Sequence, residues 1–413
     1  MRILLIGGEL HQKTGYANAL REIARNLASL DNDVLMIPYS PRIPVIRRKS
    51  IKLNGATIQP KHLSIKVALS ALISIPKDMK RNKKYLTGSK IHRLRSLLDY
   101  SYTKKYAMQQ LEEYQPSVVH IHGFLLELLP FYDAVMELGV PFVATAHGVY
   151  SFDESINLWF DRSLEKDLFL SIAEKGYPIT VVSSRVKEEV IRGFAFPELS
   201  LHVVLNGVDI DKFKPDLPEE KVTLRIKYGI DARTKVLLTV ASIQKRKNQM
   251  AVIEALGAMK PDERMNKLYL VVGAGDSSEI VEQVVSHHLE LNVHIIGKVS
   301  DEVLQDYYHI ADFFILTSTS EGFPLVFLEA MAAGLPIITY SDIEAVEEIY
   351  DKKAMMLASA RTVESLVNAI NEATAKGWDR KYIRQKAESW SWREVCEEYV
   401  EIYKIAVEKG MRR

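Results

Sequence analysis

The sequence predicts an α/β protein of two domains, each a doubly wound parallel sheet with helices on both faces. Short apolar runs of strand length alternate with segments whose apolar spacing indicates helices, and this alternation is typical of parallel sheets. The runs fall into two series, which a proline-containing linker at residues 214–218 separates. A chain of 413 residues is long enough for two or three domains.

The first series extends from the N-terminus to a turn signal at residues 206–209. Its candidate strands are residues 2–6, 34–37, 118–121, 142–146, 179–182 and 201–205. Helical patterns between them include residues 16–27 and 184–190. A strongly basic segment interrupts the series, and we expect it to carry helices of its own.

The second series follows the linker. Its candidate strands are residues 236–240, 268–272, 294–296, 313–316 and 337–339, with helices such as 249–259 and 278–289 between them. A short helix near residues 382–389 and a long amphipathic helix at 392–407 end the chain. We therefore expect an N-terminal domain of residues 1–206, completed by the C-terminal helix at 391–413, and a C-terminal domain of residues 207–390. Because such sheets bind ligands beyond the carboxyl ends of their strands, the two domains should face each other across a cleft.

The bulk composition is that of an ordinary soluble globular protein, with 47% hydrophobic and 26% charged residues. Cys396 is the only cysteine, which excludes an internal disulfide and a cysteine-based zinc cluster and is typical of a reducing compartment. The apolar start at residues 1–8 is too short for a signal peptide, and no apolar run approaches the roughly 18 residues that span a bilayer. We therefore expect a cytoplasmic protein.

Glu321 and Glu329 are the most informative pair of residues in the chain. Glu321 precedes a turn and Glu329 lies in an apolar helical pattern, eight positions later. Eight helical residues span about 12 Å, whereas the two carboxyl groups of a retaining glycosidase lie about 5 Å apart. The two acids therefore suit opposite ends of one elongated ligand, and the alternative is an ordinary core helix with an acid at each end. We expect Thr319 or Ser320 to cap this helix, whose first N–H groups suit a phosphate.

Three further motifs accompany this pair. Residues 206–209 read Asn-Gly-Val-Asp, with Phe213 and Pro215 behind them, residues 271–275 read Val-Val-Gly-Ala-Gly, and residues 296–299 read Ile-Gly-Lys-Val. In this order, and over nearly the whole chain, they and the E-x7-E spacing resemble the family 4 glycosyltransferases, which have the GT-B fold of two Rossmann-like domains.

This resemblance implies a retaining, metal-independent hexosyltransferase. The nucleoside-diphosphate sugar, of UDP or GDP type, would be a substrate held by the C-terminal domain, and no cofactor is expected. Glu329 would accept hydrogen bonds from the ribose and Glu321 from a sugar hydroxyl, while Lys247 would stabilise the leaving diphosphate. The expected catalytic residues are His147, Lys247 and Glu321. The expected donor-binding residues are Gly15, Ser242, Arg246, Lys247, Gly273, Lys298, Val299, Glu321, Gly322, Phe323, Pro324, Leu325 and Glu329.

The chain departs from the family pattern in two places: residues 341–344 read Ser-Asp-Ile-Glu where a G-G-x-x-E segment is usual, and Ser242 replaces an arginine. Ser242 stands where an arginine is usual, and a hydroxyl cannot replace a bidentate guanidinium. Either Arg246 or Lys245 reaches the diphosphate instead, or the chain is a catalytically weak relative that only binds nucleotide sugars.

Three histidines lie at or near the ends of two candidate strands in the first series. His147 comes directly after a strand and resembles the active-site histidine of the family. We favour orientation of the donor sugar or acceptor over a general-base role, because the leaving phosphate can itself take the acceptor proton. His120 and His122 alternate along another strand, and at least one should point into the core. No Asp or Cys accompanies the three histidines at ligand spacing, so no metal site is expected.

A glycine-containing loop follows the first candidate strand, at residues 7–15. Dehydrogenases also have glycine loops at this place, so a dinucleotide oxidoreductase is an alternative. The chain has no G-x-G-x-x-G and no acid after its second candidate strand. These two departures disfavour that reading.

The basic segment at residues 41–105 contains 17 lysines and arginines but only two acids, Asp78 and Asp99. An apolar stretch at 66–76 precedes the expected acceptor-side and membrane-side cations, which are Lys77, Lys80, Arg81, Lys83 and Lys84. This combination is typical of a helix that lies on an anionic membrane surface. A solvated helix pair is the alternative, and nucleic acid is disfavoured because no stacking motif accompanies the charge.

The sequence thus predicts a cytoplasmic glycosyltransferase, peripherally associated with the inner face of the membrane. Its acceptor should be lipid-linked or a cell-envelope glycan, as in polysaccharide biosynthesis. The alternatives are the same chemistry on a soluble small molecule, a catalytically weak nucleotide-sugar-binding relative, and a nucleotide-sugar epimerase of similar fold.

Overall fold

The chain forms two α/β units in the computed structural model. Unit 1 comprises Met1–Asn206 and Trp392–Arg413, and unit 2 comprises Gly207–Ser391. The structure describes residues 1–7, 15–38, 50–62, 64–82, 89–149, 159–194, 196, 200–215, 218–319, 321, 323–343 and 346–411, without the side chains of 15 and 159–162.

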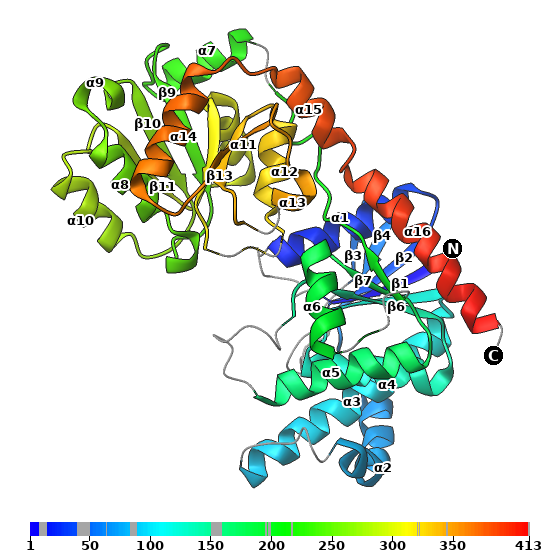
Figure 1. Cartoon of the computed structure of the whole chain (residues 1–413). Coiled ribbons are helices and arrows are strands. Elements are labelled where there is room, and N and C mark those ends of the chain that lie inside the picture. Colours follow the sequence, from blue (N-terminus) through cyan, green and yellow to red (C-terminus); the bar gives the residue numbers. More distant parts are fainter. Residues whose placement is uncertain are drawn as a thin grey trace. The chain divides into compact units, whose positions relative to one another are not determined.

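Unit 1 is built on an eight-stranded sheet in the order β3-β4-β2-β1-β5-β6-β7-β8 (Figure 1). The strands are β1 (Arg2–Ile6), β2 (Asp33–Ile37), β3 (Ile51–Leu53), β4 (Ala56–Ile58), β5 (Val118–His122), β6 (Phe142–Ala146), β7 (Ile179–Val181) and β8 (Leu201–Val203). All pair in parallel except β3 with β4. Every residue of β5 and β6 is buried, because helices cover both faces of a central parallel strand.

The helices of unit 1 come from both ends of the chain. They are α1 (Gly15–Ser29), α2 (Ile65–Asn82), α3 (Lys90–Tyr114), α4 (Leu129–Leu138), α5 (Trp159–Glu174), α6 (Ser184–Phe194) and α16 (Trp392–Met411), with a 3-10 turn at Leu126–Leu128. The buried side chains of α16 recur every three or four residues, and α16 packs against α1, β5 and β6. The Cys396 thiol lies 3.7 Å from the Ile23 carbonyl on α1. The last helix of the chain therefore completes the first unit.

The α2 and α3 helices of the basic segment pack against each other, and α3 packs against α4. A buried charge cluster joins the three helices: Lys104 Nζ lies 2.7 Å from Glu137 Oε2 and 3.6 Å from Asp78 Oδ1. Arg81 and Tyr100 both bond the Asp133 carboxylate on α4. The helix pair is therefore fixed to the unit by ionic contacts as well as by apolar packing.

Unit 2 has a six-stranded sheet in the order β11-β10-β9-β12-β13-β14, parallel throughout. Its strands are β9 (Lys235–Val240), β10 (Lys267–Val272), β11 (Val293–Gly297), β12 (Phe313–Leu316), β13 (Ile337–Tyr340) and β14 (Met355–Ala358). Its helices are α7 (Pro218–Lys227), α8 (Met250–Ala258), α9 (Pro261–Arg264), α10 (Ser278–Ser286), α11 (Asp301–Ile310), α12 (Leu325–Ala332), α13 (Val346–Ile349), α14 (Val363–Ala375) and α15 (Arg380–Glu388), with a 3-10 turn at Lys245–Lys247.

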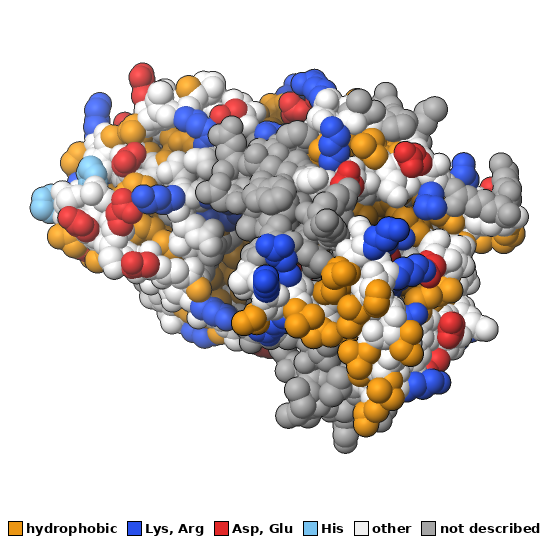
Figure 2. Space-filling model, turned by 90° about the horizontal axis from the view of Figure 1, so that it is seen from below, with side chains coloured by type: hydrophobic (Ala, Val, Ile, Leu, Met, Phe, Trp, Pro, Cys, Tyr) orange, Lys and Arg blue, Asp and Glu red, His pale blue; other side chains and the backbone are white. Residues whose placement is uncertain are grey.

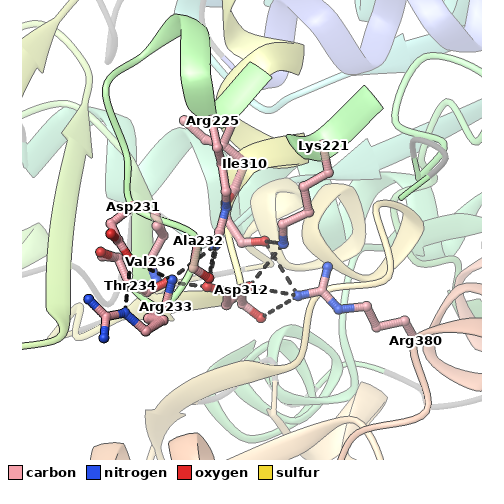
Figure 3. Close-up of polar contacts among 11 residues, drawn as sticks. Lys221, Arg225, Asp231, Ala232, Arg233, Thr234, Val236, Ile310, Asp312 and Arg380 are labelled. Carbon is pink, nitrogen blue, oxygen red and sulfur yellow. Dashed lines mark hydrogen bonds and ion pairs between the residues drawn. The ribbon is translucent and has the colours of Figure 1, made fainter. Parts of the chain in front are cut away.

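Asp312, which directly precedes β12, binds residues of the first and last helices of unit 2. Lys221 and Arg225 on α7 and Arg380 on α15 all lie within 3.4 Å of its carboxylate oxygens (Figure 3). The Val236 N–H donates a further bond to Asp312 at 2.9 Å. Since α7 is the first helix of the unit and α15 the last, this one carboxylate ties both to the central strands.

The predicted fold class is confirmed: both units are parallel-sheet α/β layers, as the two series of apolar runs indicated. Three short strands were not predicted, namely β3, β4 and β14. The first two lie in the basic segment and have three residues each, and β14 reads Met-Met-Leu-Ala, without the β-branched residues that mark strands.

Candidate active site

The carboxyl ends of β9 and β12 carry the charged cluster of unit 2. The two strands pair directly and in parallel, so the loops that follow them meet at one edge of the sheet. The Thr319 N–H donates to the Arg246 carbonyl at 2.8 Å, and the Thr317 hydroxyl donates to the Asn248 carbonyl at 2.7 Å. These bonds hold the turn at Lys245–Lys247 against the segment that contains Glu321.

Glu321 is the centre of this cluster. Its Oε1 lies 2.5 Å from Lys247 Nζ and its Oε2 lies 3.1 Å from Arg246 Nη1, while only 7% of its side chain is exposed. Burial alone would raise the pKa of this carboxyl, but the two cations outweigh burial and the pKa is lowered. Glu321 is therefore a carboxylate at neutral pH, with a cation on each oxygen.

Glu329 projects from α12, the helix that follows Glu321. Its Oε2 accepts a hydrogen bond from the Tyr308 hydroxyl on α11 at 2.7 Å. Burial raises the pKa of Glu329, and the bond from Tyr308 opposes part of that rise. Tyr308 was not predicted as a site residue, because it lies 21 positions before Glu329 on another helix and this contact has no local sequence signal.

The structure shows where the residues near the unusual Ser242 lie. Ser242 is half-buried and its backbone carbonyl accepts a bond from the Gln249 amide at 3.0 Å. Lys245 is exposed, whereas Arg246 bonds Glu321 together with Lys247. Of the two replacements that the sequence left open, Arg246 is the one that reaches the cluster.

Gly273 and its neighbours fit together through backbone contacts. A Cβ on Gly273 would lie 1.9 Å from the Ala241 carbonyl oxygen, and the residue has a φ of +156°. The Gly273 N–H donates to the Gly297 carbonyl at 2.9 Å. Lys298 and Val299 follow β11 directly, with Lys298 exposed and Val299 half-buried. The glycine is thus required for the close approach of two loops, independently of any ligand.

The start of α12 differs from the prediction. The N-cap is Pro324, which has no side-chain cap bond, so the prediction that Thr319 caps this helix is wrong. The Thr319 hydroxyl lies near the Arg246 carbonyl instead, at 3.3 Å. Phe323 is buried and Leu325 is the first helical residue, whose N–H belongs to the unpaired first turn. Gly322 and Ser320 lie outside the described residues.

A hollow of about 420 Å³ lies beside the Lys245–Lys247 turn in unit 2. Its walls include Gln244, Lys245 and Asn248 on one side and Asp276 and Glu279 on the other. Of the predicted donor-binding residues that the structure describes, none lines the hollow, so among these residues the hollow and the charged cluster are separate features of the unit.

In unit 1, the histidines gather at the carboxyl ends of β5 and β6. His122 Nδ1 and His147 Nε2 lie 3.1 Å apart and share a hydrogen bond. The ring of Tyr16, on α1, meets the His147 ring edge-on, and the Tyr16 hydroxyl donates to the His122 carbonyl at 2.6 Å. Burial lowers the pKa of His147 to about 4, so its ring is neutral at pH 7.

His120 and His122 are both fully buried, so the expectation that at least one points into the core holds for both. His120 Nδ1 lies 2.7 Å from the Tyr403 hydroxyl on α16, and its Nε2 lies 2.6 Å from the Thr145 hydroxyl. The contact of His122 with His147 was not predicted, although His122 ends β5 and His147 follows the adjacent parallel strand β6.

The remaining predicted residues lie elsewhere in unit 1. Gly15 is the first residue of α1. Lys77 and Arg81 pair with Glu137 and Asp133 of α4, and Lys80 is exposed. Lys83 and Lys84 lie outside the described residues. Two of the five cations assigned to the membrane side therefore take part in contacts within the unit.

The described part of the chain contains no group of three or more His, Cys, Asp or Glu side chains arranged to hold a metal ion. Within the same residues, no helix is long and apolar enough to cross a bilayer.

The chain matches two families of known proteins over adjoining parts. Residues 14–212 match the family described as Glycosyltransferase Family 4, and residues 220–390 match the family described as Glycosyl transferases group 1. Together the two matches cover most of both units.

Individual relatives agree with these families. An uncharacterized glycosyltransferase of Methanocaldococcus jannaschii is 28% identical over 322 residues, which are 74% of this chain and 79% of the relative. The alpha-monoglucosyldiacylglycerol synthase of Streptococcus pneumoniae is 29% identical over 245 residues, 57% of this chain and 54% of that protein, about half its length. Among solved structures, a glycosyltransferase from Rickettsia africae has a TM-score of 0.75 at 20% identity, over 98% of each chain.

The two parallel-sheet units and these matches define a nucleotide-sugar glycosyltransferase with the GT-B fold. The chain belongs to glycosyltransferase family 4. The resemblance that the motifs indicated is thereby confirmed.

Proposed function

We propose that this enzyme transfers a hexosyl group, with retention of anomeric configuration, from a UDP- or GDP-sugar to a lipid-linked or cell-envelope glycan at an anionic membrane surface. The observation that carries the chemistry is the cluster of Lys247, Arg246 and Glu321 where β9 and β12 end. Two cations and one carboxylate leave a net positive charge at the edge of the sheet, which suits a diphosphate.

The cluster supports a division of roles. A diphosphate competes with Glu321 for the two cations, so donor binding would free carboxylate oxygens to accept bonds from sugar hydroxyls. Charge on the leaving diphosphate grows as the glycosidic bond breaks, and a fixed cation stabilises that state more than the ground state. Glu329 supplies a second acceptor on α12, suited to the ribose hydroxyls. Arg246 in the cluster favours an active enzyme over a catalytically weak relative.

The acceptor part of the proposal rests on an exposed face of α2 and α3, which we call the α2–α3 patch. Its large apolar side chains are 38% to 83% exposed. They are Ile65, Leu69, Leu72, Ile73 and Met79 on α2 and Ile91, Leu94 and Leu98 on α3. Figure 2 looks onto this end of unit 1, where hydrophobic side chains gather with Lys and Arg side chains beside them. A contiguous exposed apolar area on a soluble fold indicates a partner or a membrane.

The charges around the α2–α3 patch favour an anionic membrane. Exposed lysines and arginines adjoin it, including Lys66, Lys80, Lys90 and Arg95. Asp78, one of the two acids in the basic segment, is turned inward, where Lys104 neutralises it. Each cation near an anionic surface contributes about 1 kcal/mol, and buried apolar side chains add to that. The name of the S. pneumoniae relative, which includes a diacylglycerol lipid, agrees with a lipid acceptor.

The donor half is tested by thermal shift with UDP, GDP and other nucleoside diphosphates, followed by release of that diphosphate from its hexose conjugates. A nucleoside diphosphate that binds should raise the midpoint temperature of unfolding once its concentration exceeds its Kd. The proposal also has no metal requirement, so turnover in a chelator should equal turnover without one. Sugar transferred with inverted configuration, or isomerised sugar in the absence of acceptor, would contradict it.

The acceptor half is tested by co-sedimentation with vesicles of neutral or anionic lipid at low and high salt. Binding should need anionic lipid, weaken with salt, and fall at least tenfold when Leu72 and Ile73 are both replaced by serine. Leu291→Ser is the matched control, because Leu291 is 90% exposed but lies in unit 2. Equal sedimentation of wild type with neutral and anionic vesicles, or none with either, would leave the soluble small-molecule acceptor as the better hypothesis.

A further inference from the structure

His122 is a buried histidine in which one ring nitrogen forms a hydrogen bond and the other has no hydrogen-bond partner in the described part of the chain. Its Nδ1 bonds His147 Nε2, while its Nε2 is buried and has no hydrogen-bond partner among the described residues. The two rings lie nearly parallel, with centroids 5.4 Å apart and an interplanar angle of 29°. His147 follows β6 directly and is only half-buried, so His122 stands between it and the core.

The His122 ring is held in place by His120, which lies on the same strand. The His120 ring lies against it, with ring centroids 3.8 Å apart and the ring planes tilted by 36°. His120 is itself held at both nitrogens, by Tyr403 of α16 and by Thr145 of β6. Thr145 bonds Thr180, whose hydroxyl donates onward to the Ala144 carbonyl at 3.5 Å. These contacts hold the His120 ring in place, and His120 in turn supports the His122 ring.

One hydrogen must lie between His122 Nδ1 and His147 Nε2, and the orphaned Nε2 of His122 decides which ring carries it. If His147 donated, His122 would hold its own hydrogen on Nε2, as a buried N–H without an acceptor. If His122 donates, its Nε2 is an unprotonated acceptor. Orphaned buried N–H groups are rarer in proteins than under-satisfied acceptors, so donation by His122 is favoured.

We propose that His122 is a positioning residue that donates from Nδ1 to His147 Nε2 and so fixes His147 as the tautomer with its hydrogen on Nδ1. His147 then presents an N–H donor to an oxygen of the bound sugar or acceptor, and its basic nitrogen is occupied by His122. Burial lowers the pKa of both rings, which agrees with a pair that stays neutral at pH 7. The inference rests on the proposed function only for what His147 contacts.

The tautomer is tested without any ligand. Long-range ¹H–¹⁵N spectra of the full chain labelled with ¹⁵N-histidine, with His147→Ala to assign the signal, should show His147 protonated on Nδ1 at pH 7. In His122→Leu the signal should move toward the Nε2-protonated form. In His122→Asn it should keep the wild-type state, since the asparagine amide can donate from near the Nδ1 position. A wild-type His147 protonated on Nε2, or a spectrum that His122→Leu leaves unchanged, overturns the proposal.

The effect on turnover is tested by a double-mutant cycle, measured as nucleoside diphosphate released from a panel of UDP- and GDP-hexoses. His122→Leu should lower kcat roughly tenfold with little change in KM, His122→Asn should recover most of the loss, and His122→Leu should cost nothing more in the His147→Ala background. Losses that add in the double variant would show that His122 acts on stability alone. If no donor is turned over by wild type, the proposed function fails and the spectra alone decide the inference about His122.

Discussion

Lys247 and Glu321 form a buried ion pair, with Lys247 Nζ 2.5 Å from Glu321 Oε1. The side chains are 14% and 7% exposed, and Arg246 occupies the other carboxylate oxygen. A buried charge without a partner costs several kcal/mol. The pair therefore keeps both proposed functional groups ionised in the free enzyme, in positions that a donor can exploit.

Lys247→Ala should lower kcat about 100-fold while the Kd for the nucleoside diphosphate changes less than about tenfold. The reason is that charge on the diphosphate grows toward the transition state, where loss of a fixed cation costs most. Steady-state kinetics and calorimetry separate the two effects. Lys245→Ala is the control, because Lys245 belongs to the same turn but is exposed, and it should behave as wild type. A larger effect on Kd than on kcat would reassign Lys247 to ground-state binding.

Donor affinity should fall in acid because of Glu329. Burial raises the pKa of this carboxyl above its ordinary 4.5, and only the carboxylate can accept two bonds from the ribose. Affinity should therefore be full well above that raised pKa and be lost as the pH falls through it. Tyr308→Phe removes the bond that opposes the rise, so the loss should begin at a higher pH.

The Kd for the nucleoside diphosphate is measured by calorimetry between about pH 4 and pH 8. Glu329→Gln should bind the nucleotide weakly, and its affinity should not fall further in acid. Tyr307→Phe is the control, since Tyr307 is on the same helix and its ring contacts Tyr228 instead. If the affinity of Glu329→Gln still falls in acid, the group that titrates is not Glu329.

Asp312→Ala should destabilise unit 2 by about 3 kcal/mol, because three cations would lose their shared carboxylate in a mostly buried site. Burial would raise the pKa of Asp312, but Lys221 and Arg225 outweigh it and lower the pKa below 3.8. Its contribution should therefore be present above about pH 3.8 and disappear as the pH falls through the lower folded-state pKa.

Urea denaturation of the full chain at several pH values tests this. Asp231→Ala is the matched control, since Asp231 is an exposed acid that pairs with Arg233, and its loss should leave the free energy of unfolding nearly unchanged (Figure 3). Equal destabilisation by the two substitutions would show that Asp312 is not the structural centre of the unit.

Gly273→Ala should destabilise unit 2 by about 2 kcal/mol or more and weaken donor binding, because the new Cβ would meet the Ala241 carbonyl and push the loop after β9 away. That loop leads to Arg246 and Lys247. Thermal unfolding and calorimetry report the two effects. Gly377→Ala, with no atom within 4 Å of the added Cβ, should be nearly neutral, and a neutral Gly273→Ala would mean that the loops can part without cost.

Most of the fold was predictable because the central strands of a parallel sheet are continuous apolar runs, and β5, β6 and β12 are buried at every residue. Edge strands such as β3 and β14 have no such pattern. Their positions depend on neighbouring strands that are distant in the sequence, so local composition did not reveal them.

The sequence marks the candidate site residues but not the contacts between them. Glu321, Lys247 and His147 follow strands, where side chains of an α/β sheet meet, and their motifs mark them. The pairing of Lys247 with Glu321 joins residues 74 positions apart, and the bond from Tyr308 to Glu329 joins two helices. These contacts arise from the packing of whole elements, and one sequence contains no record of them.

The place of α16 in unit 1 sets the order in which the protein is completed on the ribosome. Residues 207–391 are contiguous and have all their strands once they have been translated. Residues 1–206 emerge first, yet Tyr403, the partner of buried His120, follows the whole of unit 2 in the sequence. Part of the interior of unit 1 therefore stays uncovered until α16 has been translated.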